Sequence, residues 1–159
     1  MAPTYRLDRG FTLTRMLDAP PDVVFQAWTD PAHLNWFFNP DTRPDTSTQV
    51  DLRVGGAWRQ HMVISETTQY MTGGVYSEIV PNRKLVFAWG ASGGWPNLDE
   101  EAGPLVTVEL SPEGGRTRMD FKLQLPDQLS EAEAKAWMAK GIDKGWAETV
   151  ERLVETLGA

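Results

Sequence analysis

The sequence has no cysteine and only two histidines among its 159 residues. Without cysteine there are no disulfides, thiol nucleophiles or thiolate metal ligands, and the composition fits a reducing compartment. His33 and His61 lie far apart in the chain and do not have the spacing of a zinc or iron site. We therefore expect no metal, no cofactor and no catalytic residue that the sequence alone can name.

Basic residues and long apolar runs are also scarce. Lys and Arg number 15 against 22 Asp and Glu, which gives a formal net charge of -7. Because phosphate neutralisation needs clustered basic residues, we expect neither nucleic acid nor an anionic membrane as a partner. No apolar run is long enough to span a bilayer, and residues 1–10 lack the apolar segment of a signal peptide. These absences favour a cytoplasmic protein.

The C-terminal stretch predicts the longest element. Ser130 and Glu133 match a capping box, and apolar residues then recur at steps of three and four. We expect one helix from Ser130 to Leu157 that covers a sheet. Gly141 and Gly145 each cost about 1 kcal/mol in a helix interior. Either a backbone or bulky ring approaches them closely, or a ligand occupies the space that they leave.

The rest of the chain alternates with a period of two. Phe11 to Leu17 predicts a strand, and two short helices follow, the first from about Pro21 and the second around Leu34 to Phe37. Six more strands are predicted between Gln49 and Leu125. The sequence therefore predicts a single domain over residues 1–159 of α+β class, with a curved seven-stranded antiparallel sheet wrapped around a long C-terminal helix.

Side-chain parity predicts which residues face that helix. We expect the inner face of the sheet to hold Trp58, Met62, Phe87, Val108, Met119 and Phe121. Arg59 and His61 then face outward. The pair Gly73–Gly74 predicts a bulge or bend in a long strand from Thr68 to Val80.

Four ordered motifs make a family recognisable. Residues 19–37 read A-P-x-x-V-V-F-x-A-W-T-D-P-x-x-L-x-W-F, and residues 51–58 read D-L-R-x-G-G-x-W. Residues 74–89 contain G-x-Y-x-E-I-x-P and then R-x-L-V-F-x-W, and residues 145–153 read G-W-x-x-x-V-x-x-L. The chain resembles the activator-of-heat-shock-protein-ATPase homolog family, a branch of the START-like, birch-pollen-allergen-like helix-grip superfamily. The resemblance runs from about residue 11 to residue 157.

The resemblance implies a helix-grip fold with a cavity between sheet and C-terminal helix. Superfamily members use that cavity for lipids, hormones, polyketides or other apolar molecules. The resemblance implies no shared active site. The family name comes from a domain of a eukaryotic co-chaperone.

Aromatic residues supply the candidate site. Of the seven tryptophans, Trp28, Trp36 and Trp146 fit family motifs and are expected in the core. The other four, with apolar neighbours and the two helix glycines, are expected to line or rim the cavity. The predicted ligand-binding residues are Trp58, Gln60, Met62, Tyr76, Phe87, Trp89, Trp95, Trp137, Met138, Gly141, Ile142 and Gly145. Arg53 and Glu78 are interpreted as a structural ion pair or turn anchors near strand ends.

These observations predict binding of a small apolar or aromatic molecule. One alternative is a cyclase-like or hydrolase-like enzyme that orients a polyketide-like or aromatic substrate in the same pocket, with Gln60 or Tyr76 as its acid or base. The other is a protein-interaction module of co-chaperone type. A homodimer and a chaperone partner are left open by the sequence.

Overall fold

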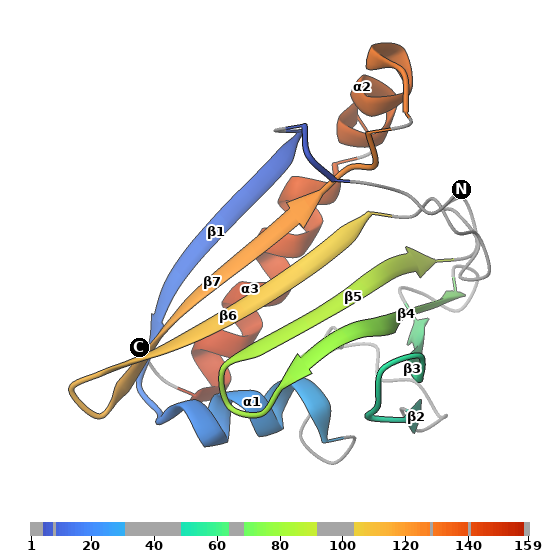
Figure 1. Cartoon of the computed structure of the whole chain (residues 1–159). Coiled ribbons are helices and arrows are strands. Elements are labelled where there is room, and N and C mark those ends of the chain that lie inside the picture. The colour runs from blue at the N-terminus through green and yellow to red at the C-terminus, as the bar shows by residue number, and fades with distance from the viewer. Residues whose placement is uncertain are drawn as a thin grey trace.

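The protein folds as an antiparallel sheet whose last helix lies along one face, while the helix before it stands beyond the end of the sheet (Figure 1). The computed structural model describes residues 5–7, 9–30, 49–63, 69–91, 104–127, 129–139 and 141–157. The strands are β1 Gly10–Leu17, β2 Gln49–Val50, β3 Ala57–Val63, β4 Gln69–Val80, β5 Lys84–Ala91, β6 Leu105–Glu113 and β7 Arg116–Gln124. The helices are α1 Pro21–Thr29, α2 Glu131–Ala139 and α3 Ile142–Leu157.

The sheet has seven strands in the order β1-β7-β6-β5-β4-β3-β2. Every neighbouring pair is antiparallel. This arrangement, with its C-terminal helix, confirms the predicted α+β helix-grip class. The β6–β7 hairpin turns on Gly114 and Gly115, whose φ angles are 58° and 82°. Two successive residues with positive φ suit a two-residue hairpin, so β6 and β7 continue up to this turn.

The inner face of the sheet is the predicted one wherever the side chains are described. Trp58, Phe87, Val108, Met119 and Phe121 are all buried. Along β7 the burial alternates, so that a buried residue is followed by a partly or fully exposed one. The side chains of Met62, Arg59 and His61 lie outside the described part of the structure. The period-two pattern is therefore confirmed for five of the six predicted residues.

The first helix covers one end of that inner face. Pro21 occupies its first turn, and the buried residues Val24, Phe25, Ala27 and Trp28 follow. This confirms the predicted first short helix, because proline suits an N-terminal position that donates no helical hydrogen bond. The second predicted short helix, around residues 34–37, lies outside the described residues.

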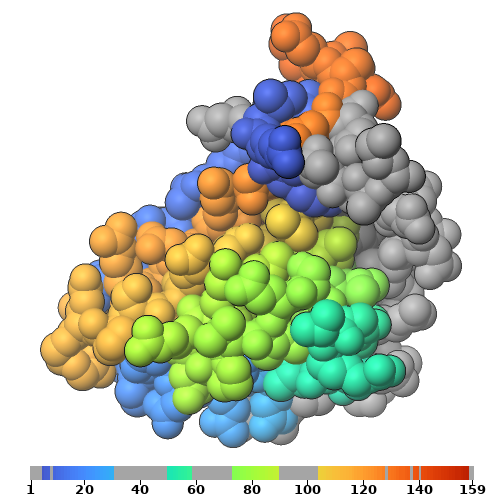
Figure 2. Space-filling view, in the orientation of Figure 1, coloured from blue at the N-terminus to red at the C-terminus, as the bar shows by residue number. Residues whose placement is uncertain are grey.

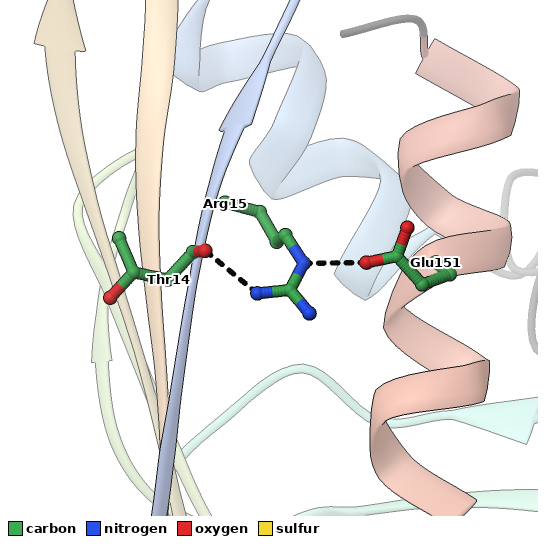
Figure 3. A network of polar contacts seen from close by, with 3 residues as sticks. All are labelled: Thr14, Arg15 and Glu151. Atoms are coloured by element: carbon green, nitrogen blue, oxygen red, sulfur yellow. Dashed lines mark hydrogen bonds and ion pairs between the residues drawn. The ribbon is translucent and has the colours of Figure 1, made fainter. Parts of the chain in front are cut away.

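The last helix packs along the sheet through four buried residues, Ile142, Trp146, Val150 and Leu153. At its flank, Arg15 of β1 reaches Glu151 of α3, with 2.5 Å between Nε and Oε1 (Figure 3). The Arg15 Nη1 also donates to the carbonyl oxygen of Thr14. Because both charged groups are substantially exposed, this pair contributes no more than about 1 kcal/mol. Apolar packing holds the helix.

The prediction of a single helix from Ser130 to Leu157 is wrong. The capping box at its start is confirmed: the Ser130 N–H donates to Glu133 Oε1, and the Glu133 N–H donates to Ser130 Oγ. The Ser130 backbone N–H and then its hydroxyl hold the pKa of Glu133 below its usual value. The helix ends at Ala139, however, because Gly141 has a φ of 79°. A left-handed residue closes one helix before the next begins.

Substitution of Gly141 should therefore lower the free energy of unfolding, whereas substitution of a glycine inside a continuous helix would raise it. We expect Gly141→Ala to lower the free energy of unfolding by about 1 to 2 kcal/mol, because a Cβ disfavours the left-handed conformation. Gly141→Asn should cost less, since asparagine tolerates positive φ better. Urea denaturation of the three proteins measures this. An alanine variant as stable as the wild type would mean that the helix is continuous in solution.

One strand is very short, and one strand feature differs from the prediction. β2 has only two residues, because the chain turns where the Gly56 N–H donates to the Arg53 carbonyl oxygen. The expected bulge at Gly73–Gly74 is displaced: the β4–β5 register shifts between Tyr76 and Glu78. The bulge therefore lies directly after Tyr76, one of the predicted site residues.

Candidate functional site

Three aromatic rings meet on the inner face of β3, β4 and β5. Trp58 and Phe87 contact edge to face, with ring centroids 5.3 Å apart and an interplanar angle of 85°. Tyr76 meets Phe87 in the same way at 6.4 Å and 87°. These geometries are favourable for aromatic pairs. The register brings the rings together, because Tyr76 pairs with Phe87 across β4 and β5.

A glycine makes this packing feasible. Gly74 pairs with Trp58 on one side and with Trp89 on the other. A Cβ built on Gly74 would lie 2.6 Å from Phe87 Cδ2 and 2.8 Å from both Trp58 Nε1 and the Ala88 carbonyl oxygen. No side chain fits there without a shift of its neighbours. The sequence predicts only a bulge or bend at Gly74, because this packing role depends on the register of three strands.

A second chain of rings joins the sheet to α3 and α1. Trp89 contacts Trp146 of α3 with centroids 5.3 Å apart, and Trp146 contacts Phe121 at 4.8 Å. Phe121 also stacks on Trp28 of α1 at 6.2 Å. Trp28 and Trp146 are buried, as predicted for core residues. Packed aromatic side chains therefore connect β5 and β7 with α3 and α1.

Tyr76 is fixed in position by its backbone. Its N–H donates to the Gly56 carbonyl oxygen, and its carbonyl oxygen accepts from the Gly55 N–H. Gly55 has a φ of 85°, which lets the chain turn against β4 at this point. The bulge then follows Tyr76 directly. Bulges commonly redirect side chains next to functional sites.

The Tyr76 hydroxyl is the unusual polar group of this face. The residue is 1% exposed, and its hydroxyl has no hydrogen-bond partner within the described part of the chain. Burial, and to a lesser extent the Asp51 carboxylate, raise the pKa of Tyr76 above its ordinary value. The group therefore remains protonated at neutral pH. It is a hydrogen-bond donor and not a base.

Four of the predicted ligand-binding residues, Trp58, Tyr76, Phe87 and Trp89, belong to the buried core. Trp58 and Tyr76 both contact Phe87, whereas Trp89 contacts Trp146. Ile142 is buried at the start of α3. The side chains of Gln60, Met62 and Trp137, and the whole of Trp95, lie outside the described residues.

The remaining predicted residues lie elsewhere. Met138 lines a separate groove of about 700 Å³, whose lining consists of Arg9, Gly10, Leu125, Glu131, Ala134, Lys135, Met138 and Ala139. Gly141 ends α2, and Gly145 is exposed, with nothing within 4 Å of a Cβ built on it. Neither explanation offered for the helix glycines, close approach or space for a ligand, describes these two positions. The sequence does not predict this groove, because Arg9 lies far from α2 in the chain and Leu125 lies outside its helical pattern.

The charged candidates form surface pairs. Arg53 Nε lies 2.8 Å from Asp51 Oδ2, and Lys84 Nζ lies 3.3 Å from Glu78 Oε2. Arg53 thus anchors a turn, as one interpretation expected, but it does not pair with Glu78. Within the described ranges no three acidic or histidine side chains are grouped so as to hold a metal ion. No helix of those ranges is long and apolar enough to cross a membrane.

Comparison with known proteins identifies the family of this chain. The family model described as Activator of Hsp90 ATPase homolog 1-like protein matches residues 18–158. The chain belongs to this family. The recognition from the four sequence motifs is thereby confirmed. No curated protein matches the sequence.

Solved structures share the family fold at low identity. Protein Ms6760 from Mycobacterium smegmatis has a TM-score of 0.76 at 20% identity, over 100% of this chain and 97% of that one. Protein NE0264 from Nitrosomonas europaea has a TM-score of 0.71 at 24% identity, over 92% of each chain. Protein CV1439 from Chromobacterium violaceum has a TM-score of 0.64 at 21% identity, over 95% and 98%. These likenesses concern the fold alone.

Proposed function

We propose that this family member binds a small apolar or aromatic molecule that carries one hydrogen-bond acceptor. The ligand would lie between the sheet and the C-terminal helix, against Trp58, Tyr76 and Phe87, which we call the aromatic face. The observation that supports it is the buried Tyr76 hydroxyl without a partner in the described part of the chain. A buried hydroxyl that makes no hydrogen bond costs about 1 to 3 kcal/mol. A ligand acceptor would remove that cost.

The surroundings of the hydroxyl define the ligand class. Trp58 and Phe87 offer ring edges and faces, and aromatic faces of this kind favour flat or apolar molecules. Among the fully buried residues of the described part, the polar side chains besides Tyr76 and the tryptophans are Thr29 and Thr117. Both threonine hydroxyls already donate to backbone carbonyl oxygens. An apolar ligand with one acceptor for the Tyr76 hydroxyl therefore complements the aromatic face.

Protonation of Tyr76 favours binding over base catalysis. A general base needs a pKa near the working pH, whereas burial moves that of Tyr76 upward. The hydroxyl can orient a ligand by donating one hydrogen bond. Orientation by few polar groups in an apolar surrounding is typical of small-molecule sites.

The Tyr76→Phe variant should separate binding from stability. Removal of an unpartnered buried hydroxyl should leave the free energy of unfolding unchanged or raise it by up to about 1 kcal/mol. Affinity for an acceptor-bearing aromatic ketone, 2-acetylnaphthalene, should fall about three- to tenfold with the lost hydrogen bond. Tryptophan fluorescence titration gives the affinities, and urea denaturation gives the stability.

Two controls sharpen this test. The hydrocarbon analogue 2-ethylnaphthalene lacks the acceptor and should bind wild type and Tyr76→Phe equally. Tyr5→Phe removes the hydroxyl of a half-buried tyrosine outside the aromatic face, whose pKa burial and then Asp127 raise to about 12, and it should leave both affinities unchanged. Failure of the wild-type protein to prefer the ketone, or a Tyr76→Phe variant that keeps the preference, would refute the proposed function.

A further inference from the structure

A groove separate from the aromatic face lies beneath α2. It has a volume of about 700 Å³ and is bounded by α2, by Gly10 at the start of β1 and by Leu125 just after β7. Figure 2 shows α2 in orange, standing beyond the body of the sheet next to the blue N-terminal segment. The apolar part of the groove comes from Leu125, Ala134, Met138 and Ala139. One side of α2 therefore faces this groove.

Hydrogen bonds hold the N-terminal segment next to the groove. The Asp127 carboxylate accepts from the N–H groups of Arg6 and Leu7, at 2.9 Å and 2.8 Å. The Leu125 N–H donates to the Arg9 carbonyl oxygen at 2.8 Å. These contacts fix Arg9 at the groove.

The guanidinium of Arg9 forms no ion pair with a carboxylate in the described part of the chain. Its Nη1 donates to the Leu129 carbonyl oxygen at 2.8 Å, and its Nη2 donates to the Pro126 carbonyl oxygen. Its Nε is buried and has no acceptor within the described residues. Carbonyl groups hold the cation in place but do not neutralise it. A fixed positive charge is thus built into one wall.

A second cation lies on α2. Lys135 and Glu131 both line the groove, one helical turn apart, and no ion pair between them is formed in the described structure. Two cations and one carboxylate therefore line the groove, whose other lining side chains are apolar. The Asp127 carboxylate is not part of this lining and already accepts from the N–H groups of Arg6 and Leu7. The whole chain has a formal net charge of -7, so this groove is a local exception to its charge. An anion is attracted here and repelled by most of the remaining surface.

We propose that this groove binds an amphipathic carboxylate, with its charged end toward Arg9 and Lys135 and its alkyl chain against Leu125, Ala134 and Met138. Charge complementarity selects the carboxylate, and the apolar wall selects the chain. Affinity should rise about fourfold for each methylene that the wall buries. The inference is independent of the ligand proposed for the aromatic face.

The probe is decanoate, below its micelle concentration, titrated against protein labelled with ¹³C at the methionine methyl groups. We expect saturable shifts of the Met138 methyl signal, weaker shifts with octanoate, and none with decyltrimethylammonium at equal concentration. Lys135→Glu reverses one exposed charge and should weaken decanoate binding about five- to tenfold. Ala139→Trp places a large ring on the wall and should abolish binding.

Two matched controls are available, one on α3 and one on α2. Lys144→Glu makes the same charge change on α3 at an exposed position outside the groove, and Ala136→Trp adds the same ring to α2 at an exposed position outside it. Both should bind decanoate as the wild type does. Circular dichroism of all four variants establishes that they are folded.

Three results would overturn the inference. The first is the absence of a decanoate-dependent shift of the Met138 methyl signal, even if decanoate binds elsewhere in the protein. The second is equal binding of decanoate and the cationic amphiphile, or a Lys135→Glu variant that binds unchanged. The third is a groove that seats a second copy of the chain: sedimentation would then depend on protein concentration, Ala139→Trp would abolish this dependence, and decanoate would not bind.

Discussion

Replacement of Gly74 by alanine should destabilise the protein by about 3 kcal/mol or more. The added Cβ would lie 2.8 Å from the carbonyl oxygen of Ala88, and a backbone atom in a paired strand cannot move aside without breaking its register. It would also lie 2.6 Å from Phe87 and 2.8 Å from Trp58, whose rings contact each other. Overpacking of a filled core costs about 1 to 3 kcal/mol, and a fixed backbone atom adds to it. Urea denaturation followed by tryptophan fluorescence measures the change.

Gly145→Ala is the matched control for this substitution. Nothing lies within 4 Å of a Cβ built on Gly145, and the residue is exposed within α3. Alanine should therefore raise the free energy of unfolding by about 0.5 to 1 kcal/mol through helix propensity. The same chemical change thus has opposite signs at the two glycines. A Gly74→Ala variant as stable as the wild type would mean that the rings are not packed as described.

Phe121→Ala should cost about 3 to 5 kcal/mol. The ring of Phe121 is fully buried and contacts a different element on each side: Phe11 of β1 and Trp28 of α1, both at 6.2 Å, and Trp146 of α3 at 4.8 Å. Its removal leaves a cavity where sheet and both helices meet, and large rings around a cavity collapse poorly. We expect the melting temperature and the urea midpoint to fall together.

Lys122→Ala tests whether this effect belongs to the inner face. Lys122 is the next residue of β7 and is exposed on the opposite side of the sheet. Its substitution should change stability by less than about 0.5 kcal/mol. A large effect at Lys122 and a small effect at Phe121 would place β7 in the opposite register.

Much of this fold could be predicted because the signals are local. The alternation of Met119, Phe121 and Leu123 with polar residues identified the inner face of β7, since strand side chains alternate strictly between faces. The capping box of Ser130 and Glu133 identified the start of α2, since it needs only residues one turn apart. The four motifs identified the family over most of the chain.

The errors arose where the signal is not local. Gly141 looked like an interior glycine because apolar spacing continues beyond it, yet a left-handed glycine ends a helix with the same neighbours. The double glycine in β4 suggested a bulge, whereas Gly74 is needed by rings on the adjacent strands. Arg9 joins the groove through carbonyl groups more than a hundred residues away. No pattern around Arg9 itself indicates that contact.

The candidate site was predictable in part for the same reason. Parity within single strands selected Trp58, Tyr76, Phe87 and Trp89, and cross-strand register gathered them. The unpartnered state of the Tyr76 hydroxyl could not be predicted, because it depends on every atom around it. Its role toward a ligand stays a proposal.

The most direct measurement of that role is the ¹³C signal of the tyrosine Cζ atoms during titration with 2-acetylnaphthalene. The protein has three tyrosines, so the spectrum has three signals, and Tyr76→Phe identifies the one from Tyr76. The account predicts that the Tyr76 signal shifts and saturates with the ketone and shifts less with 2-ethylnaphthalene, whereas the signal of Tyr5 stays unchanged. A Tyr76 signal that does not move, or that moves equally with ketone and hydrocarbon, would contradict the account.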